Sequence, residues 1–193
     1  MNTDDSTPTP NLQDYRVRGY SPGGNGCKRA LWYGVNALIF KSSWLPLYAI
    51  KRAILRLFGA QIGPGVVIKP GVNIKYPWRL RIEAYSWIGE GASIDNLADV
   101  HIGAHCCISQ QAYLLTGNHD YRRVDFALMT ANIVLEDGAW VGARATVCPG
   151  IRMRRNSILA VGSVLTRNSE PNGIYVGNPA TFTKLRKLTD TPA

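Results

Sequence analysis

Large aliphatic residues recur at every sixth position over much of the chain. Five groups of three follow this rule, and every position holds Ile, Leu, Val or Met. The groups are Ile62, Ile68 and Ile74; Ile82, Ile88 and Ile94; Ile102, Ile108 and Leu114; Leu135, Val141 and Val147; and Met153, Leu159 and Leu165. Ordinary strand alternation has a period of two. A period of six instead predicts a solenoid of about five coils, in which short strands form the faces of a prism and stacked aliphatics fill its axis.

A second column lies four residues after each aliphatic position and holds mostly small residues, such as Ala92, Ala112 and Ser157. We expect these small residues, together with nearby glycines, at the corners of the prism, because glycine adopts a positive φ in tight turns without a steric penalty.

The interruptions of the pattern are regular as well. The steps from Ile74 to Ile82 and from Ile94 to Ile102 are eight residues, and the step from Leu114 to Leu135 is twenty-one. Each follows the third aliphatic residue of a group, so the extra residues should leave the prism at one corner of successive coils. Stacked coils are about 4.8 Å apart. Residues just after Ile94 should therefore lie near the start of the long loop, and such loops are where scaffolds carry function.

The segments divide one domain into four parts. Residues 1–26 are poor in large apolar side chains and are predicted to be a mobile N-terminal segment. Residues 27–60 form a helical cap or a membrane-facing segment, 61–170 the β-helix with a catalytic loop at 115–134, and 171–193 a C-terminal tail with a short helix.

Residues 30–58 are rich in Trp and large aliphatics, with Lys51, Arg52 and Arg56 among them. Two helices broken near Ser42–Pro46 are predicted, and the apolar run over 30–40 is too short to span a bilayer. Two roles remain open: a cap over the first coil, or an interfacial membrane anchor.

The composition narrows the classes of molecule that the protein is expected to bind. The net charge is +9, but aromatic residues are not interleaved with the basic clusters, which argues against nucleic acid. A phosphate-rich cofactor or an anionic membrane face fits the charge better. The start of the chain is polar and does not resemble a signal peptide. The four cysteines include no C-x-x-C pair, which favours reduced thiols in a cytoplasmic protein.

Four local motifs accompany the repeat. They are Thr116-Gly117-Asn118-His119, Trp140-Val141-Gly142-Ala143, Gly162-Ser163-Val164-Leu165-Thr166 and Gly177-Asn178-Pro179-Ala180. With these motifs the chain, from about Ile62 to Leu188, resembles the hexapeptide-repeat acyltransferases, whose fold is a left-handed parallel β-helix. The N-terminal apolar segment running into residues 56–60 makes it most similar to the colanic acid and exopolysaccharide acetyltransferases.

The resemblance implies an O-acetyltransferase that moves an acetyl group from acetyl-CoA to a sugar hydroxyl. It assigns His119 as general base, a task suited to imidazole near neutral pH. It also implies a catalytic and acceptor-contacting role for Asn96, with Asp95 as a further acceptor ligand. Asp120 is a substrate-site candidate, and either Asp120 or Glu136 could orient the imidazole.

The resemblance places the cofactor along the later coils. Gly142 and Ala143 would offer backbone N–H groups to the thioester oxygen. The remaining cofactor candidates are Trp140, Val161, Gly162, Thr166, Lys184 and Arg186. Lys184 and Arg186, on the short C-terminal helix, would meet phosphates, although Thr181 stands where the family often has Arg.

In the family the site lies between subunits of a homotrimer, so a trimer is expected here. The expected acceptor is a sugar or lipid-linked saccharide in exopolysaccharide synthesis, and the location is the cytoplasm, with contact to the inner face of the membrane through residues 30–58 as an option.

Two alternatives compete with this hypothesis. A zinc enzyme like the γ-carbonic anhydrases would need three histidines, but the spacing of His101, His105 and His119 does not match that family, and no metal is expected. The other alternative is a non-catalytic β-helix scaffold, against which the intact loop motif argues.

Overall fold

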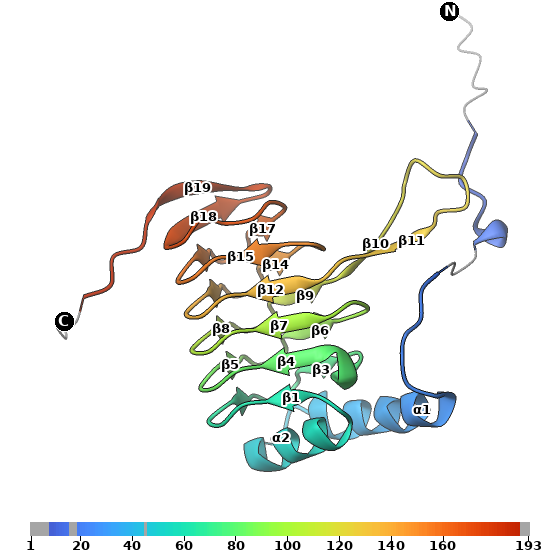
Figure 1. The fold of residues 1–193 in the computed structure, drawn as a ribbon, viewed down its shortest axis with the longest axis horizontal. Helices are drawn as coiled ribbons and strands as arrows, with labels where there is room; N and C mark the ends of the chain where they lie inside the picture. Colours follow the sequence, from blue (N-terminus) through green and yellow to red (C-terminus); the bar gives the residue numbers. More distant parts are fainter. Residues whose placement is uncertain (1–7, 16–18, 45, 190–193) are drawn as a thin grey trace, which may run out of the picture.

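The chain forms a left-handed parallel β-helix, seen in a computed structural model that describes residues 8–15, 19–44 and 46–189. Three sheets make the faces of the prism (Figure 1). The first face contains β1 (Gln61–Ile62), β4 (Leu80–Ile82), β7 (Val100–Ile102), β12 (Ile133–Leu135) and β15 (Arg152–Met153). The second contains β2 (Val67–Ile68), β5 (Trp87–Ile88), β8 (Cys107–Ile108), β13 (Trp140–Val141), β16 (Ile158–Leu159), β18 (Gly173–Gly177) and β19 (Ala180–Leu185). The third contains β3 (Asn73–Ile74), β6 (Ser93–Asp95), β9 (Tyr113–Leu115), β14 (Thr146–Val147) and β17 (Val164–Leu165).

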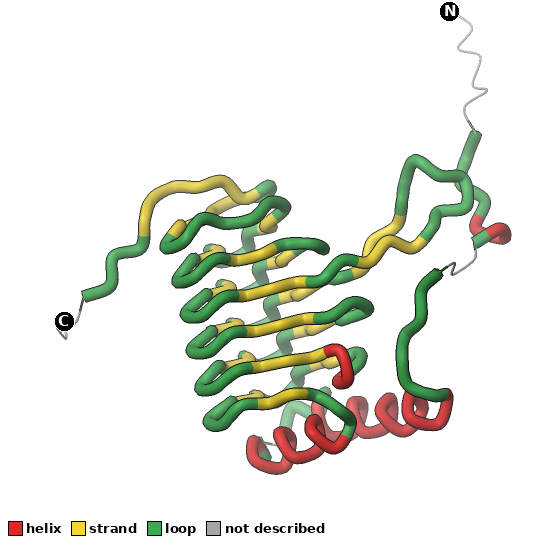
Figure 2. The backbone as a smooth tube through the Cα atoms, in the orientation of Figure 1, coloured by secondary structure: helices red, strands yellow, loops and turns green. Residues whose placement is uncertain are grey.

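The aliphatic column fills the axis, as the period of six predicts. All fifteen of its residues are buried, and register pairs such as Ile62 with Ile82 and Ile94 with Leu114 stack them coil on coil. Five coils are complete and β18 begins a sixth, so the solenoid is slightly longer than expected. In Figure 2 the strands are short and the turns between them form the corners of the prism.

The corner column is also buried, except that Trp78 is half-buried and Asn118 is exposed. Both exceptions lie in enlarged corners. Cys106 fills a corner position, and burial raises the pKa of its thiol to about 12, so it stays protonated. All four cysteines are free thiols.

Helices close the first end of the solenoid. Helix α1 (Gly26–Val35) continues as a π-helical turn, η2 (Asn36–Phe40), and α2 (Tyr48–Leu57) follows after a break. The Asn25 side chain caps α1 by accepting a hydrogen bond from the Lys28 N–H at 2.8 Å. The buried Trp32 side chain donates from Nε1 to the Ile74 carbonyl at 2.9 Å, which fixes α1 against the first coil.

Helix α2 caps the open edge of the first coil with cations. Lys51, Arg52 and Arg56 donate to the carbonyls of Lys69, Val66 and Ile62, respectively. These carbonyls have no preceding coil to bond to, so the side chains satisfy acceptors that would otherwise lack a partner.

The residues before α1 lie along the third-face corner. The Arg79 guanidinium donates to the Ser21 carbonyl at 2.7 Å, and Trp78 Nε1 donates to the Pro22 carbonyl at 2.8 Å. A short 3-10 turn, η1 (Leu12–Asp14), lies further out, where the Asn11 N–H donates to the Val124 carbonyl. The predicted mobile segment also includes residues 1–7 and 16–18, which lie outside the described residues.

The C-terminal segment corrects one expectation. The short helix expected after Pro179 does not form; Ala180–Leu185 is strand β19, antiparallel to β18. The physical reason is local: Thr181, Phe182 and Thr183 favour extended backbone, and the turn at Gly177–Pro179 returns the chain along β18. Among the described residues, no helix is both long enough and apolar enough to cross a membrane.

Candidate active site

The long loop is a hairpin that leaves the prism between the third and first faces. Strand β10 (Gly117–His119) pairs antiparallel with β11 (Leu128–Thr130), and His119 lies opposite Leu128. The hairpin extends well beyond the solenoid in Figure 1. Its position follows from the twenty-one-residue step between Leu114 and Leu135.

The base of the hairpin rests on the enlarged corner of the coil below. The buried Thr116 hydroxyl donates to the Asp95 carbonyl at 2.7 Å and accepts from the Ala98 N–H at 3.0 Å. A Cβ on Gly117 would stand 2.4 Å from Leu97 Cδ1, so only glycine fits there without a shift of Leu97. The expected stacking of the corner after Ile94 under the hairpin is confirmed.

The His119 imidazole is held by its neighbours on the hairpin. Its Nδ1 lies 2.8 Å from the Phe126 carbonyl oxygen, and its ring stacks on the Phe126 ring at 4.4 Å between centroids with 7° between planes. The Tyr15 ring packs on it at 5.6 Å. Because a carbonyl can only accept, Nδ1 carries the proton, and in the neutral ring Nε2 is left as an acceptor.

The orienting group is therefore a main-chain carbonyl instead of either expected carboxylate. Asp120 binds Arg122, whose side-chain hydrogen bond lowers the pKa of that carboxyl. Glu136 accepts from the Arg152 side chain and the Arg155 N–H. Sequence reasoning missed Phe126, since a carbonyl carries no residue-type signal.

Asp95 and Asn96 leave their corner in different directions. Asn96 is fully buried, and its amide bonds both main-chain groups of Tyr76: Oδ1 accepts at 2.9 Å and Nδ2 donates at 2.6 Å. It links two enlarged corners, and its hydrogen bonds are to Tyr76 and not to the imidazole. The Asp95 carboxylate instead faces the outside of the third face, where it pairs with Lys75 at 2.9 Å and accepts from the Tyr113 hydroxyl at 3.3 Å.

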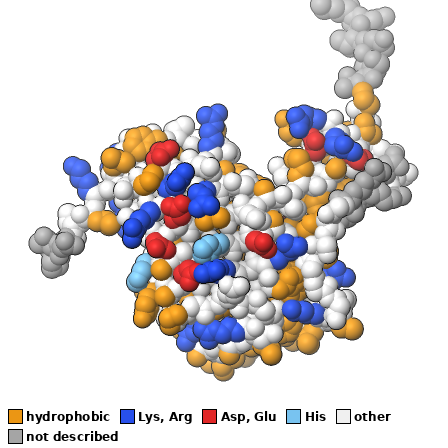
Figure 3. All heavy atoms as spheres, viewed as in Figure 1, with side chains coloured by type: hydrophobic (Ala, Val, Ile, Leu, Met, Phe, Trp, Pro, Cys, Tyr) orange, Lys and Arg blue, Asp and Glu red, His pale blue; other side chains and the backbone are white. Residues whose placement is uncertain are grey.

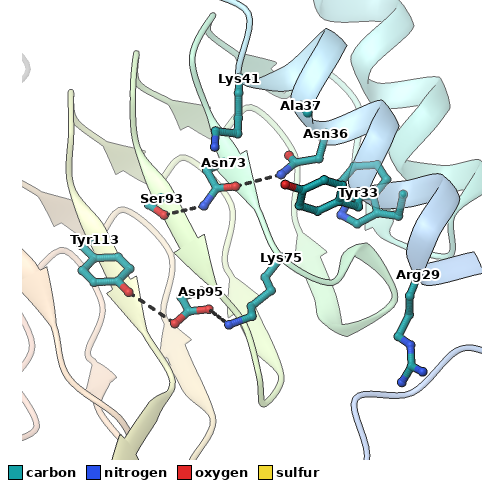
Figure 4. Close-up of a pocket in the computed structure, with 11 residues that line it drawn as sticks. Arg29, Tyr33, Asn36, Ala37, Lys41, Asn73, Lys75, Ser93, Asp95 and Tyr113 are labelled. Carbon is teal, nitrogen blue, oxygen red and sulfur yellow. Dashed lines mark hydrogen bonds and ion pairs between the residues drawn. The ribbon is translucent and has the colours of Figure 1, made fainter. Parts of the chain in front are cut away.

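A pocket of about 360 Å³ opens between α1 and the third face (Figure 4). Figure 4 shows Asp95 between Lys75 and Tyr113, with Asn73 joining Asn36 to Ser93 beside them. Burial, and then the nearby Asp95 carboxylate, raises the pKa of Tyr113. The lining therefore holds two sets of hydrogen-bonded polar groups, spread over the first three coils, the third of which leads into the hairpin.

The signal for this pocket was present in the sequence. Outward-facing polar residues precede or follow the aliphatic positions of the third face at equal coil positions, as Asn73, Ser93 and Tyr113 do. What the sequence did not show was that α1 would cover them.

Five of the cofactor candidates gather near one edge of the prism, between the second and third faces. Trp140 is 42% exposed on β13, and its Nε1 donates to Ser109 Oγ at 2.9 Å. Gly142 and Ala143 form the following corner, and Val161 and Gly162 the corner stacked on it, with the Gly162 N–H donating to the Ala143 carbonyl.

The two expected oxyanion donors differ. The Gly142 N–H donates to the Leu159 carbonyl at 2.7 Å and is used within the solenoid. A Cβ there would stand 2.7 Å from the same carbonyl oxygen, so glycine is needed for coil stacking. The Ala143 N–H has no acceptor within the described part of the chain and is the donor that remains for a ligand.

The last three cofactor candidates lie elsewhere. Thr166 is exposed after β17, at the corner between the third and first faces. Lys184 is exposed on β19. The Arg186 guanidinium donates to the Gly138 carbonyl at 3.1 Å, at the corner between the first and second faces. The eight candidates are thus distributed around the solenoid instead of forming one cluster in a single chain.

A second pocket, of about 460 Å³, lies on the second face below Trp140. Trp87, Cys107 and Ser109 line it, and the register places Trp140 directly above Cys107. Sequence reasoning missed these residues, although Trp87, Cys107 and Trp140 each come one position before an aliphatic residue of the same face.

The three histidines occupy separate places. His101 lies on β7 with Nε2 at 3.4 Å from Glu83, and the exposed His105 ring stacks on Tyr85 at 5.4 Å between centroids. His119 is on the hairpin. Within the described residues, no group of three His, Cys, Asp or Glu side chains could hold a metal ion.

Three basic residues above the first coils are paired with acids. Arg122 binds Asp120, Arg123 binds Asp125, and Arg152 binds Glu136. Figure 3 shows Lys and Arg side chains next to Asp and Glu side chains over the upper coils and the hairpin.

The comparisons with known proteins agree with this architecture. No protein-family model matches the chain. Over 168 residues the chain is 38% identical to the colanic acid biosynthesis acetyltransferase WcaF of Escherichia coli K12, covering 87% of this chain and 92% of that protein. Galactoside O-acetyltransferase of the same organism is 22% identical over 143 residues, 72% of each chain.

Solved structures show the same fold. A hexapeptide-repeat acetyltransferase of Vibrio cholerae superposes with a TM-score of 0.75 at 22% identity, covering 83% of this chain and 92% of the other, and a second structure of that protein holds acetyl-CoA. A galactoside acetyltransferase in complex with coenzyme A has a TM-score of 0.72 at 18% identity, covering 82% and 80%. The identity and coverage shared with WcaF show that the chain belongs, with WcaF, to the hexapeptide-repeat acetyltransferase family.

Proposed function

We propose that this protein is an acetyl-CoA-dependent O-acetyltransferase that modifies a sugar hydroxyl in exopolysaccharide synthesis, with His119 as general base. One observation carries the proposal: the Phe126 carbonyl accepts from Nδ1 at 2.8 Å, which leaves Nε2 as the proton acceptor. The relatives named for acetyl transfer and the acetyl-CoA complex of the Vibrio cholerae protein support the reaction class.

His119 can act in both halves of the transfer. Acetyl-CoA, when bound, supplies the activated acetyl group. Nε2 takes the proton as the acceptor oxygen bonds the acetyl carbon, and the imidazolium returns that proton to the departing sulfur. Nδ1–H stays bonded to the Phe126 carbonyl throughout, and the Phe126 ring holds the imidazole plane.

The pocket at Asp95 supports a sugar as acceptor. Its carboxylate, amide and hydroxyl groups can exchange hydrogen bonds with several hydroxyls, while the ion pair with Lys75 holds the Asp95 side chain in place. The likeness to galactoside O-acetyltransferase supports a sugar as the class of acceptor, and the likeness to WcaF supports an exopolysaccharide precursor within that class. Asp120, bound to Arg122 on the hairpin, is a second acceptor candidate.

The later coils carry groups suited to acetyl-CoA, the acyl donor. The Ala143 N–H is directed at no acceptor among the described residues, Val161 is 71% exposed, and Trp140 adds an exposed ring. The Ala143 N–H suits the thioester oxygen, and Val161 and Trp140 suit the apolar arm of the cofactor. The exposed Lys184 suits phosphate, whereas Arg186 would first have to leave the Gly138 carbonyl.

A homotrimer would complete the site. The hairpin carries His119 away from the corner between the third and first faces of its own solenoid, while the Ala143 edge lies between the second and third faces. A neighbouring copy could bring its own Ala143 edge to His119. We place the enzyme in the cytoplasm, where its four free cysteines stay reduced.

The test measures coenzyme A release from acetyl-CoA with nucleotide- or lipid-linked sugar acceptors. His119→Ala should lower kcat by about 10²–10⁴-fold, as loss of a general base does. The matched control is His105→Asn, because His105 is exposed at a φ of 55°, which Asn tolerates, and it should keep wild-type activity. Full activity in His119→Ala would remove the base assignment, and a wild type that does not bind acetyl-CoA would remove the function.

A further inference from the structure

Helix α2 is amphipathic in the opposite sense from an ordinary surface helix. Its basic residues face the protein, where Lys51, Arg52 and Arg56 bond the carbonyls of the first coil. Apart from Arg56, which is exposed while it bonds these carbonyls, its outward side chains are apolar: Ile50 is 49% and Leu57 82% exposed. A surface helix normally turns its polar face to water. The capping function has therefore left an apolar face outside.

The preceding segments extend this surface. Leu31 and Leu38 of α1 and η2 are 63% and 77% exposed, and Trp44 and Leu47 in the connection are 78% and 42% exposed. Both helices lie across the base of the solenoid in Figure 1. Figure 3 shows hydrophobic side chains along that lower edge with Lys and Arg side chains just above them. We call this surface, made of Leu31, Leu38, Trp44, Leu47, Ile50 and Leu57, the cap face.

The positive charge of the protein is concentrated in the same part of the chain. No Asp or Glu occurs between Asp14 and Glu83, whereas that stretch holds twelve Lys and Arg residues. From residue 83 onward, ten acidic residues balance ten basic ones, so the excess of +9 comes from residues 1–82. Arg29 and Lys41 are exposed there.

This charge distribution selects the occupant of the cap face. A second copy docking on the same surface would bring two basic caps together without an acidic residue to pair them. An anionic lipid surface offers opposite charge to the basic groups and an apolar boundary to the leucines and Trp44.

We propose that the cap face is a membrane-docking surface that lies in the interface of an anionic bilayer, with the two helices parallel to it. This goes beyond acetyl transfer and does not rest on it. Docking would hold the solenoid upright on the membrane, with the hairpin and the Asp95 pocket on coils above the surface, within reach of a lipid-linked acceptor.

The experiment is flotation of the purified full chain with vesicles, without acetyl-CoA or acceptor, so its result is independent of the catalytic proposal. Vesicles of phosphatidylcholine alone are compared with equal parts of phosphatidylcholine and phosphatidylglycerol. The wild type should bind the anionic vesicles at least about tenfold more tightly, and added salt should weaken that binding.

The variant Leu38→Ser/Trp44→Ser/Leu57→Ser should lose at least about tenfold of the affinity for anionic vesicles, since the apolar contribution is removed. These side chains are largely exposed, so the fold should be unaffected, which circular dichroism checks. The matched control is Phe182→Ser/Leu185→Ser/Leu188→Ser, one aromatic and two leucines exposed at the other end of the chain. It should bind like the wild type.

Three results would overturn the proposal. They are a wild type that binds both vesicle types equally or neither, a cap-face variant that binds as the wild type does, and a cap-face variant whose oligomeric state by light scattering changes while vesicle binding stays the same. The last would assign the cap face to a contact between copies.

Discussion

At the scale of single residues, the site depends on main-chain groups as much as on side chains. Phe126 adopts a positive φ of 48°, an uncommon conformation for a bulky residue, and this turn aims its carbonyl at His119 Nδ1. Strain of this kind persists where the surroundings enforce it and is concentrated at functional sites. The histidine was visible in the sequence, whereas the group that sets its tautomer was not.

Asp95 provides the residue-scale prediction. Asp95→Asn should raise KM for the sugar acceptor about tenfold with a smaller change in kcat, because the charge paired with Lys75 is lost while the proton-transfer group is untouched. Steady-state kinetics with varied acceptor measures the effect. Asp99→Asn, at an exposed carboxylate paired with Arg79 outside this pocket, is the control and should behave as wild type. A fall in kcat at unchanged KM would instead place Asp95 in the chemical step.

At the scale of elements, each coil needs a neighbour that donates hydrogen bonds to its carbonyls, and at the open edge of the first coil helix α2 does so. Arg56 illustrates how α2 replaces a strand: its guanidinium donates to the carbonyls of Ile62 and Gly63. A strand would offer N–H groups at this edge, and the helix offers side-chain cations in their place.

Arg56→Ala should lower the free energy of unfolding by about 1–3 kcal/mol, because the Ile62 carbonyl loses its charged donor. Denaturant unfolding followed by circular dichroism measures this. Arg154→Ala removes an exposed guanidinium from a later coil and should change stability by less than about 0.5 kcal/mol. Equal effects of the two substitutions would show that the edge carbonyls do not depend on Arg56.

The elements also show what sequence can and cannot predict. The repeat predicted the strands and the hairpin position, because burial at a fixed period leaves its mark on every coil. The prediction of a C-terminal helix was wrong because it followed the family pattern and disregarded the strand-forming residues Thr181-Phe182-Thr183. Asn96 was expected near His119. An amide side chain can also bond main-chain groups, and that of Asn96 bonds the backbone of Tyr76.

At the scale of the whole molecule, the candidate groups of one chain do not form one site. His119 is on the projecting hairpin, and Ala143 and Val161 are on another edge of the solenoid. A single sequence contains no record of which copy supplies which group, so the shared site could be expected only through family resemblance.

Mixed trimers provide the test at this scale. Trimers made only of His119→Ala chains or only of Val161→Glu chains should each have low acetyltransferase activity. In the second variant the new carboxylate would repel and obstruct acetyl-CoA. Mixing and reassembling them should restore part of the activity, since some interfaces then combine an intact His119 with an intact Val161. Light scattering should give about three times the 21.2 kDa chain mass. A monomeric active enzyme, or mixtures without recovery, would contradict a site shared between copies.

The two ends of the solenoid have a consequence for assembly into fibres. A stack of parallel strands exposes unpaired edges at both ends, and such edges can template the growth of filaments. Here α2 occupies one end with cationic side chains, and the antiparallel strand β19 flanks β18 at the other. Each end thereby presents a surface unlike a coil, which disfavours the stacking of one solenoid on the end of another.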